Sequence, residues 1–180
     1  MKTLIIYFFL FTALCISSCS DPEGTDEKKK LISLIDSLHK KMLNPQSMEL
    51  DKNRAQQGIA AYEDFIKKYP DDSLAAEYLF RVSDLFRGRG DNAKALESLK
   101  QICKKYPDHK KIPDCIFLQG YYMQELFGDT AAAKQYYQKL LSKYPHHPFA
   151  DDAKALMNMF GKTDEQILKE FEKNAESQKK

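Results

Sequence analysis

The tripeptide Lys-Tyr-Pro occurs three times at nearly constant spacing, and this repetition constrains the fold more than any other feature of the chain. The tripeptides end at Pro70, Pro107 and Pro145, so successive copies are 37 and 38 residues apart. A period of this length is typical of a solenoid, in which each unit stacks on its neighbours. Proline ends a helix because it lacks an amide proton and disfavours helical geometry in the preceding residue. Each Tyr-Pro pair is therefore expected to close one repeat.

The residues before each proline repeat as well, in a pattern typical of a helix. A small residue stands twelve positions before each proline, and large apolar residues stand eight and five positions before it. These residues are Gly58, Tyr62 and Phe65, then Ala95, Leu99 and Ile102, then Ala133, Tyr137 and Leu140. Residues at these spacings share one face of an α-helix. The segment before each Tyr-Pro stop is thus predicted to be a helix with one buried face.

Another helix is predicted in the first half of each unit. Its apolar and small positions are Leu79, Val82, Ser83 and Phe86 in one unit, and Ile116, Gly120 and Met123 in the next. Gly90-Asp91 and Gly128-Asp129 follow these segments. Glycine adopts the left-handed conformation that ends many helices, and aspartate caps the start of the next one. Each unit is predicted to be a helix, a Gly-Asp turn, a helix and a Tyr-Pro stop.

This arrangement resembles the tetratricopeptide-repeat family over residues 48–175. The matching positions are Leu79, Val82, Ser83, Phe86, Ala95, Leu99, Ile102 and Pro107, and Gly120, Ala133, Tyr137, Leu140 and Pro145. The units are longer than the family's usual length of about 34 residues, and Ser83 replaces the usual glycine. The longer Tyr-Pro-terminated unit is similar to the repeats of the lipoprotein of outer-membrane β-barrel assembly and of the periplasmic accessory protein of the Tol–Pal system. The resemblance implies an all-α fold, a right-handed α-solenoid of about four helix pairs.

Terminal segments differ from the central units, as the ends of a solenoid require. Leu31, Leu34, Ile35, Leu38 and Met42 form an apolar stripe, which predicts an N-terminal capping helix within residues 31–47. Residues 149–160 are a further repeat-like helix ending before Gly161. A capping box at residues 163–166 opens a last helix, with Ile167, Leu168 and Phe171 expected inward. Residues 176–180 are predicted to be a disordered tail, and the count is eight helices.

The N-terminus carries the features of an export signal. Lys2 precedes an apolar run, and the run ends in Ile16-Ser17-Ser18-Cys19, which resembles the lipobox of bacterial lipoproteins. Residues 1–18 are therefore predicted to be a signal peptide, Cys19 an acylated residue bearing fatty acids such as palmitate, and residues 19–30 a flexible tether. A plain cleaved signal and an uncleaved anchor are the alternatives.

A multi-chain lipid anchor would hold the protein permanently at a membrane. Ser20 lacks the aspartate that retains lipoproteins in the inner membrane of enteric bacteria, which favours the outer membrane. At that membrane the protein would lie either on the periplasmic face or on the cell surface.

Residues for partner binding are implied by the family resemblance. In this family the first helices of each pair line a concave groove. The corresponding positions are Glu77, Phe80, Asp84 and Arg87 in one unit, and Asp114, Phe117, Tyr121 and Gln124 in the next. Aromatic anchors among charged residues suit a peptide or protein surface. The alternative is that Phe80 and Phe117 pack between the repeats.

Other residues could support chemistry, but each has a simpler interpretation. His146 and His147 near Asp151 and Asp152 could bind a metal, whereas adjacent histidines in a turn point apart, so no metal site is predicted. Cys103 and Cys115 flank a short turn. They would form a disulfide or serve as two small buried residues.

Catalysis and nucleic-acid binding are not expected. The chain has no phosphate-binding glycine loop after a strand and no catalytic triad pattern, so neither an enzyme nor a cofactor is predicted. The net charge of +2 comes from scattered basic and acidic residues, which disfavours nucleic acid as a partner.

The sequence therefore predicts a lipid-anchored protein-protein interaction scaffold of the bacterial envelope, whose partner is an unidentified envelope protein or an extended peptide. One alternative is a subunit of outer-membrane protein assembly or of Tol–Pal-type envelope maintenance. Another, from a different class, is a metal-handling or cell-wall accessory factor.

Overall fold

The computed structural model describes residues 22–42 and 49–177. Within these ranges the chain forms eight α-helices, as predicted. They are α1 (Pro22–Lys41), α2 (Lys52–Lys68), α3 (Ser73–Gly88), α4 (Asn92–Lys105), α5 (Ile112–Glu125), α6 (Thr130–Lys143), α7 (Ala150–Met159) and α8 (Asp164–Ser177). The predicted signal peptide 1–18 and Cys19 lie outside the described residues.

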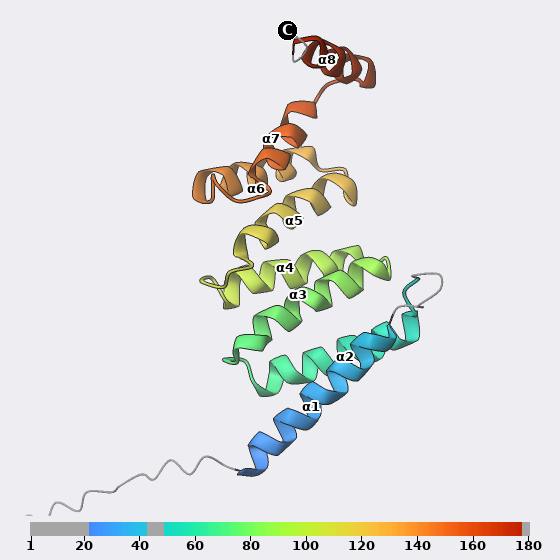
Figure 1. The fold of residues 1–180 in the computed structure, drawn as a ribbon, viewed down its shortest axis with the longest axis vertical. Helices are drawn as coiled ribbons and strands as arrows, with labels where there is room; N and C mark the ends of the chain where they lie inside the picture. The colour runs from blue at the N-terminus through green and yellow to red at the C-terminus, as the bar shows by residue number, and fades with distance from the viewer. Residues whose placement is uncertain (1–21, 43–48, 178–180) are drawn as a thin grey trace, which may run out of the picture.

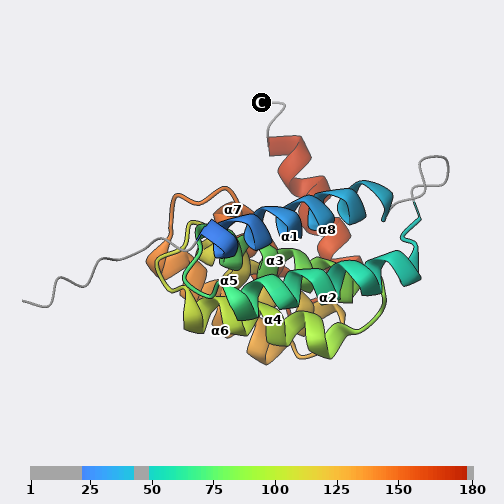
Figure 2. The ribbon, with the colours of Figure 1, turned by 90° about the horizontal axis from the view of Figure 1, so that it is seen from below.

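The helices stack in chain order, from α1 at one end to α8 at the other (Figure 1). Consecutive helices from α1 to α7 pack on one another, and the most extensive packing joins α3 to α4 and α5 to α6. Seen along the stack, α3, α5 and α7 lie toward one side and α2, α4 and α6 toward the other (Figure 2). We call these sides the first-helix face and the second-helix face. The prediction of an all-α solenoid built from helix pairs is confirmed.

The Tyr-Pro stops end the second helices as expected. The backbone amides of Tyr69, Tyr106 and Tyr144 each donate to the carbonyl four residues earlier, at 2.8, 2.9 and 2.7 Å. The proline that follows has no amide to continue this ladder. The same three-residue sequence therefore produces the same helix end in α2, α4 and α6.

Left-handed glycines end the first helices. Gly90, Gly128 and Gly161 have φ values of 84°, 68° and 77°. The predicted aspartate caps are only half confirmed: the side chain of Asp129 accepts a hydrogen bond from the amide of Ala132 at 2.9 Å, whereas the side chain of Asp91 makes no cap hydrogen bond.

Small residues let the two helices of a pair approach closely. A Cβ added to Gly120 in α5 would lie 2.7 Å from a ring carbon of Tyr137 in α6. In the preceding unit the buried Ser83 donates its hydroxyl hydrogen bond to the carbonyl of Ala95, at 2.9 Å. The serine that replaces the family's glycine is thus accommodated by a hydrogen bond across the helix pair.

The N-terminal helix begins earlier than predicted, so the assignment of residues 19–30 to a flexible tether is wrong from residue 22 onward. Four charged residues in this part of α1 form ion pairs. Glu27 pairs with Lys68 at 2.8 Å, Lys28 pairs with Asp72, and Lys30 pairs with Asp26 at 2.6 Å within the helix. The first two pairs attach this part of α1 to α2 and to the turn that follows it.

The rest of α1 covers the end of the stack, in the manner expected of a capping helix. Leu31, Ile35 and Met42 are buried, and Leu38 is half-buried, but Leu34 is exposed. The helix ends at Lys41, and the remainder of the predicted 31–47 segment includes residues 43–48, which are not described.

The C-terminal helix starts as predicted but packs differently. Thr163 and Gln166 form the reciprocal capping box, with hydrogen bonds of 3.0 and 3.3 Å. Leu168, expected inward, is 59% exposed, because α8 lies at the end of the stack and no other helix of the described ranges covers it (Figure 1). The side chain of Phe171 lies outside the described residues. The predicted disordered tail 176–180 begins too early, since α8 continues to Ser177, and residues 178–180 lie outside the described residues.

None of the helices in the described ranges combines the length and the apolar character needed to cross a membrane.

Candidate functional site

The residues predicted to contact a partner lie on α3 and α5, the first helices of two neighbouring pairs. Their spacing of three and four residues places each set along one side of its helix. Of the α3 set, Asp84 and Arg87 are exposed and Glu77 and Phe80 half-buried. Tyr121 of α5 is exposed as well, whereas Phe117 is buried. Asp114 and Gln124, also of α5, are half-buried.

Phe117 packs inside the molecule. Its ring stacks on Phe149 with centroids 4.5 Å apart and an angle of 16° between the planes, and it lies 5.6 Å from the ring of Tyr137. Only 8% of Phe117 is exposed. The sequence offered two interpretations of Phe117, and the structure supports packing between repeats. The prediction that Phe117 is an accessible anchor in the groove is wrong.

Phe80, at the equivalent position of the preceding unit, keeps part of its ring accessible. The Lys111 ammonium lies 5.0 Å from the ring centroid. This cation–π contact joins α3 to the residue that precedes α5, and such contacts stabilise exposed sites by about 0.5–1 kcal/mol. Two phenylalanines at one repeat position thus differ in environment, since Phe117 has Phe149 beside it and Phe80 has a lysine.

A shallow pocket opens between α5 and α7 on the first-helix face. It encloses about 350 Å³ and is lined by Phe117, Leu118, Tyr121, Asp152, Ala155 and Leu156. Tyr121 is 38% exposed, one of the few large aromatic side chains with an accessible face in the described part of the chain. A mostly apolar hollow beside an accessible tyrosine is an arrangement that accepts an apolar side chain of a protein partner.

Charged groups occupy the predicted partner-contact positions of α3. Asp84 is exposed at the surface, but the surrounding protein partly shields its carboxyl group from water, and this desolvation raises its pKa. The neighbouring Arg87 and Arg81 oppose the shift. Glu77 pairs with Arg81 at 3.2 Å. The Asp84 carboxylate and the Arg87 guanidinium form no ion pair with other described residues, so both are available to orient a charged ligand.

Two polar side chains of α5, Gln124 and Tyr122, interact with the interior of the molecule instead of facing a partner. Gln124 accepts a hydrogen bond from the Tyr137 hydroxyl at 3.2 Å and donates one to Glu125 at 2.7 Å. Ser83 and Arg87 lie close enough to the buried Tyr122 hydroxyl to lower its pKa slightly, but neither meets the distance and angle of a hydrogen bond, and no other described residue does. Burial raises the pKa of Tyr122. Gln124 therefore supports α6 rather than standing free, and Tyr122 is a polar group buried at an energetic cost.

Cys103 and Cys115 lie together, as their positions on either side of the turn predicted, but both are free thiols. The hydrogen bond from the Cys115 thiol is the main cause that lowers the pKa of Cys103 to about 6, and burial opposes the shift. Gln119 donates to the Cys103 sulfur at 3.3 Å. The same contact and burial raise the pKa of Cys115. Cys103 is thus the thiol of the pair that ionises more readily.

The histidine pair forms part of a turn. His146 is exposed, and the Nδ1 atom of His147 accepts a hydrogen bond from the amide of Phe149 at 3.3 Å. The carboxylate of Asp151 pairs with Lys154 at 2.9 Å. The described residues contain no group of three or more His, Cys, Asp or Glu side chains that could hold a metal ion.

A hollow on the second-helix face was missed by the sequence analysis. It lies between α2 and α4, over α3. The signal that could have revealed it is Ser98, which occupies the repeat position held by Tyr136 in the next unit.

Comparison with known proteins gives one result about the fold and none about a partner. A family model described as tetratricopeptide repeat matches residues 46–72, 77–109 and 114–147, which together make up more than half of the chain. No curated protein matches the chain.

Proposed function

Because this chain belongs to the tetratricopeptide-repeat family, we propose that it is a lipid-anchored scaffold whose first-helix face binds an envelope protein or an extended peptide. Tetratricopeptide repeats suggest a protein-protein interaction scaffold, and such proteins are generally not catalytic. The observation that carries the proposal is the accessible Tyr121 beside the apolar pocket between α5 and α7.

The chemistry of this surface favours a segment with an apolar side chain. Leu118, Ala155 and Leu156 supply the apolar lining, and the edge of Phe117 completes it. Burial of apolar surface contributes about 25 cal/mol per Å², and aromatic residues such as tyrosine are enriched among the residues that dominate binding energy. Asp84, Arg87 and Asp152 add charges of both signs, which favour orientation and specificity over raw affinity.

The membrane anchor in this proposal rests on the sequence. The lipobox-like Ile16-Ser17-Ser18-Cys19 after an apolar run supports acylation of Cys19, and Ser20 supports placement in the outer membrane. The longer repeat unit supports a subunit role in outer-membrane protein assembly or in Tol–Pal-type envelope maintenance as the more specific form of this proposal.

Site-specific photocrosslinking tests the binding surface. A photoreactive phenylalanine analogue would replace Tyr121 in the full chain within cells, and the same analogue at Phe127 provides a matched control, since Phe127 is 45% exposed but does not line the pocket. We expect a discrete adduct at position 121 that is absent at position 127. The adduct should disappear when Leu156→Asp is introduced, because a carboxylate would then stand in the pocket. Identical adducts at both positions, or none at position 121, would refute the proposed surface.

Metabolic labelling tests the anchor separately. Cells fed with tagged palmitate should label the wild-type chain and fail to label Cys19→Ala, which should also leave the membrane fraction. Label that persists in Cys19→Ala would rule out acylation at this residue. The two experiments are independent, so failure of the anchor leaves the binding surface to be judged by the crosslinks.

A further inference from the structure

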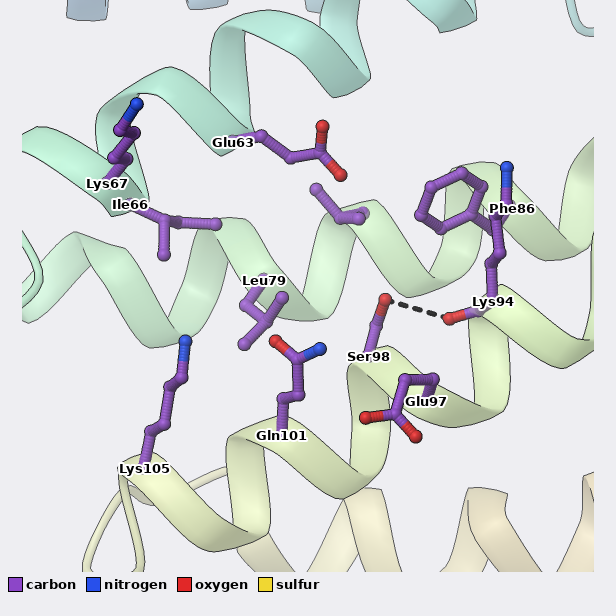
Figure 3. Close-up of a pocket in the computed structure, with 11 residues that line it drawn as sticks. Glu63, Ile66, Lys67, Leu79, Phe86, Lys94, Glu97, Ser98, Gln101 and Lys105 are labelled. Carbon is purple, nitrogen blue, oxygen red and sulfur yellow. Dashed lines mark hydrogen bonds between the residues drawn. The ribbon is translucent and has the colours of Figure 1, made fainter.

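The second-helix face carries a groove between α2 and α4 that the proposed function does not use (Figure 3). Its volume is about 440 Å³. The floor is apolar and comes from Leu79, Val82 and Phe86 of α3, together with Ile66 of α2. Lysines and glutamates from α2 and α4 stand around this floor.

One repeat position in the lining of the groove holds a small residue. Ser98 in α4 corresponds to Tyr136 in α6, one unit of 38 residues later. Tyr136 is half-buried, and its pKa is raised mainly by burial, with a smaller contribution from Cys103 of α4. Ser98 instead bonds to the Lys94 carbonyl of its own helix at 2.9 Å and does not extend across the groove (Figure 3). The hollow therefore lies beside the repeat position at which the next unit carries an aromatic side chain.

The rim of the groove favours a carboxylate at one end. Lys67 and Lys105 flank that end, whereas Glu63 and Glu97 lie nearer the other end (Figure 3). Neither Lys67 nor Lys105 forms an ion pair with any residue in the described ranges. At the opposite end the ammonium of Lys94 lies 5.4 Å from the Phe86 ring centroid. Two unpaired lysines at the border of an apolar floor therefore complement a peptide in which an acidic residue stands next to an apolar one.

We propose that this groove binds an acidic peptide segment of a partner protein through one aromatic side chain. The ring occupies the hollow beside Ser98, over Leu79 and Val82, and a neighbouring carboxylate lies between Lys67 and Lys105. This site is on the opposite side of α3 from the first-helix face, so it does not depend on the function proposed above. A scaffold with two such faces can hold two partners at once.

Substitutions that fill the hollow or reverse its charge test this proposal. Ser98→Tyr introduces into the groove the residue type that the next unit carries at this position, Tyr136. Ser142→Tyr is the matched control, because Ser142 is an exposed serine of α6 that makes the same kind of hydrogen bond to its own helix. Lys67→Glu with Lys105→Glu reverses the charge at two exposed positions, where folding is not at risk. Circular dichroism of each variant checks that helicity is retained.

The probe is a phage library of short peptides with a fixed central Phe or Tyr and random flanks, and a second library has a fixed central Ala. Both libraries are selected on the purified full-length wild-type chain in detergent. We expect enrichment only from the aromatic library, with Asp or Glu near the ring. The enriched peptides should bind Ser98→Tyr and the double lysine variant about tenfold or more weakly than wild type, and Ser142→Tyr equally well.

Several results would overturn the proposal. They are the absence of enriched peptides, enrichment of neutral or basic flanks, and equal binding to wild type and Ser98→Tyr. If Ser98→Tyr fails to fold, unchanged binding of the enriched peptides to the double lysine variant overturns the proposal instead. Analytical ultracentrifugation adds another outcome: a wild-type dimer that dissociates in Ser98→Tyr but not in Ser142→Tyr would assign the groove to a second copy of the chain.

Discussion

Replacing Tyr122 by phenylalanine should stabilise the protein or leave its stability unchanged, although most substitutions of fully buried residues are destabilising. Tyr122 has no exposed surface, and its hydroxyl has no hydrogen-bond partner among the described residues. Leaving a buried polar group unpaired costs about 1–3 kcal/mol. Tyr122→Phe removes that group and keeps the ring that packs in the core. We therefore expect a gain of up to about 1 kcal/mol in the free energy of unfolding.

Tyr137 is the matched comparison, because it is equally buried and its hydroxyl donates a hydrogen bond to Gln124 at 3.2 Å. Burial raises the pKa of both phenols, so both are neutral at pH 7. Tyr137→Phe should lose about 0.5–1.5 kcal/mol, the net value of a typical hydrogen bond. The two variants should thus differ by about 2 kcal/mol, or by roughly 4–8 °C in Tm for a chain of this size.

Urea and thermal unfolding of the full-length chain, followed by circular dichroism at pH 7, measure this difference. The order expected is Tyr122→Phe at or above wild type and Tyr137→Phe below it. If Tyr122→Phe instead loses 1 kcal/mol or more, the Tyr122 hydroxyl must have a partner in solution, and the reasoning from its burial would be refuted.

Three other predictions follow from individual contacts. The hydrogen bond from the neighbouring Cys115 thiol lowers the pKa of Cys103 to about 6. The rate at which iodoacetamide alkylates Cys103 should therefore reach half its maximum near pH 6. A midpoint near the ordinary pKa of a thiol would contradict this assignment. Burial of Asp72 opposes ionisation, but hydrogen bonds from Lys28 and from a backbone amide outweigh it and lower the pKa of this carboxyl. Its stabilising effect is therefore present above the unfolded pKa of about 3.9 and lost as pH falls through the lower folded value. Proteolysis of α1 should become faster in that acidic range, and equal acid sensitivity in Asp72→Asn would argue against the pairing. Gly120→Ala should lower the free energy of unfolding by about 1 kcal/mol, because overpacking outweighs the gain in helix propensity. The added Cβ would lie 2.7 Å from the fully buried Tyr137 ring. An unchanged urea unfolding curve would show that the helix pair can separate at no cost.

The candidate site was only partly predictable, and the two phenylalanines at one repeat position show why. The spacing within α3 and α5 placed Phe80 and Phe117 on equivalent sides of their helices, and the family resemblance put both in a groove. Phe149, from the turn before α7, covers Phe117, whereas Phe80 is met by Lys111. The neighbour in the next repeat decides exposure, and periodicity within one helix contains no information about it.

Properties set by neighbouring residues were determined by the sequence alone. The Tyr-Pro stops, the left-handed glycines after the first helices and the capping box of α8 depend on bonds between residues a few positions apart, so each segment specifies its own helix end. The tertiary structure decided what depends on distant residues. The first turns of α1 form ion pairs with Lys68 and Asp72, which lie more than forty positions from Glu27 and Lys28. The groove beside Ser98 exists only where α2 and α4 flank α3. Local bonds determine where each helix begins and ends, but the exposed surfaces that bind partners arise only when helices from different repeats pack together.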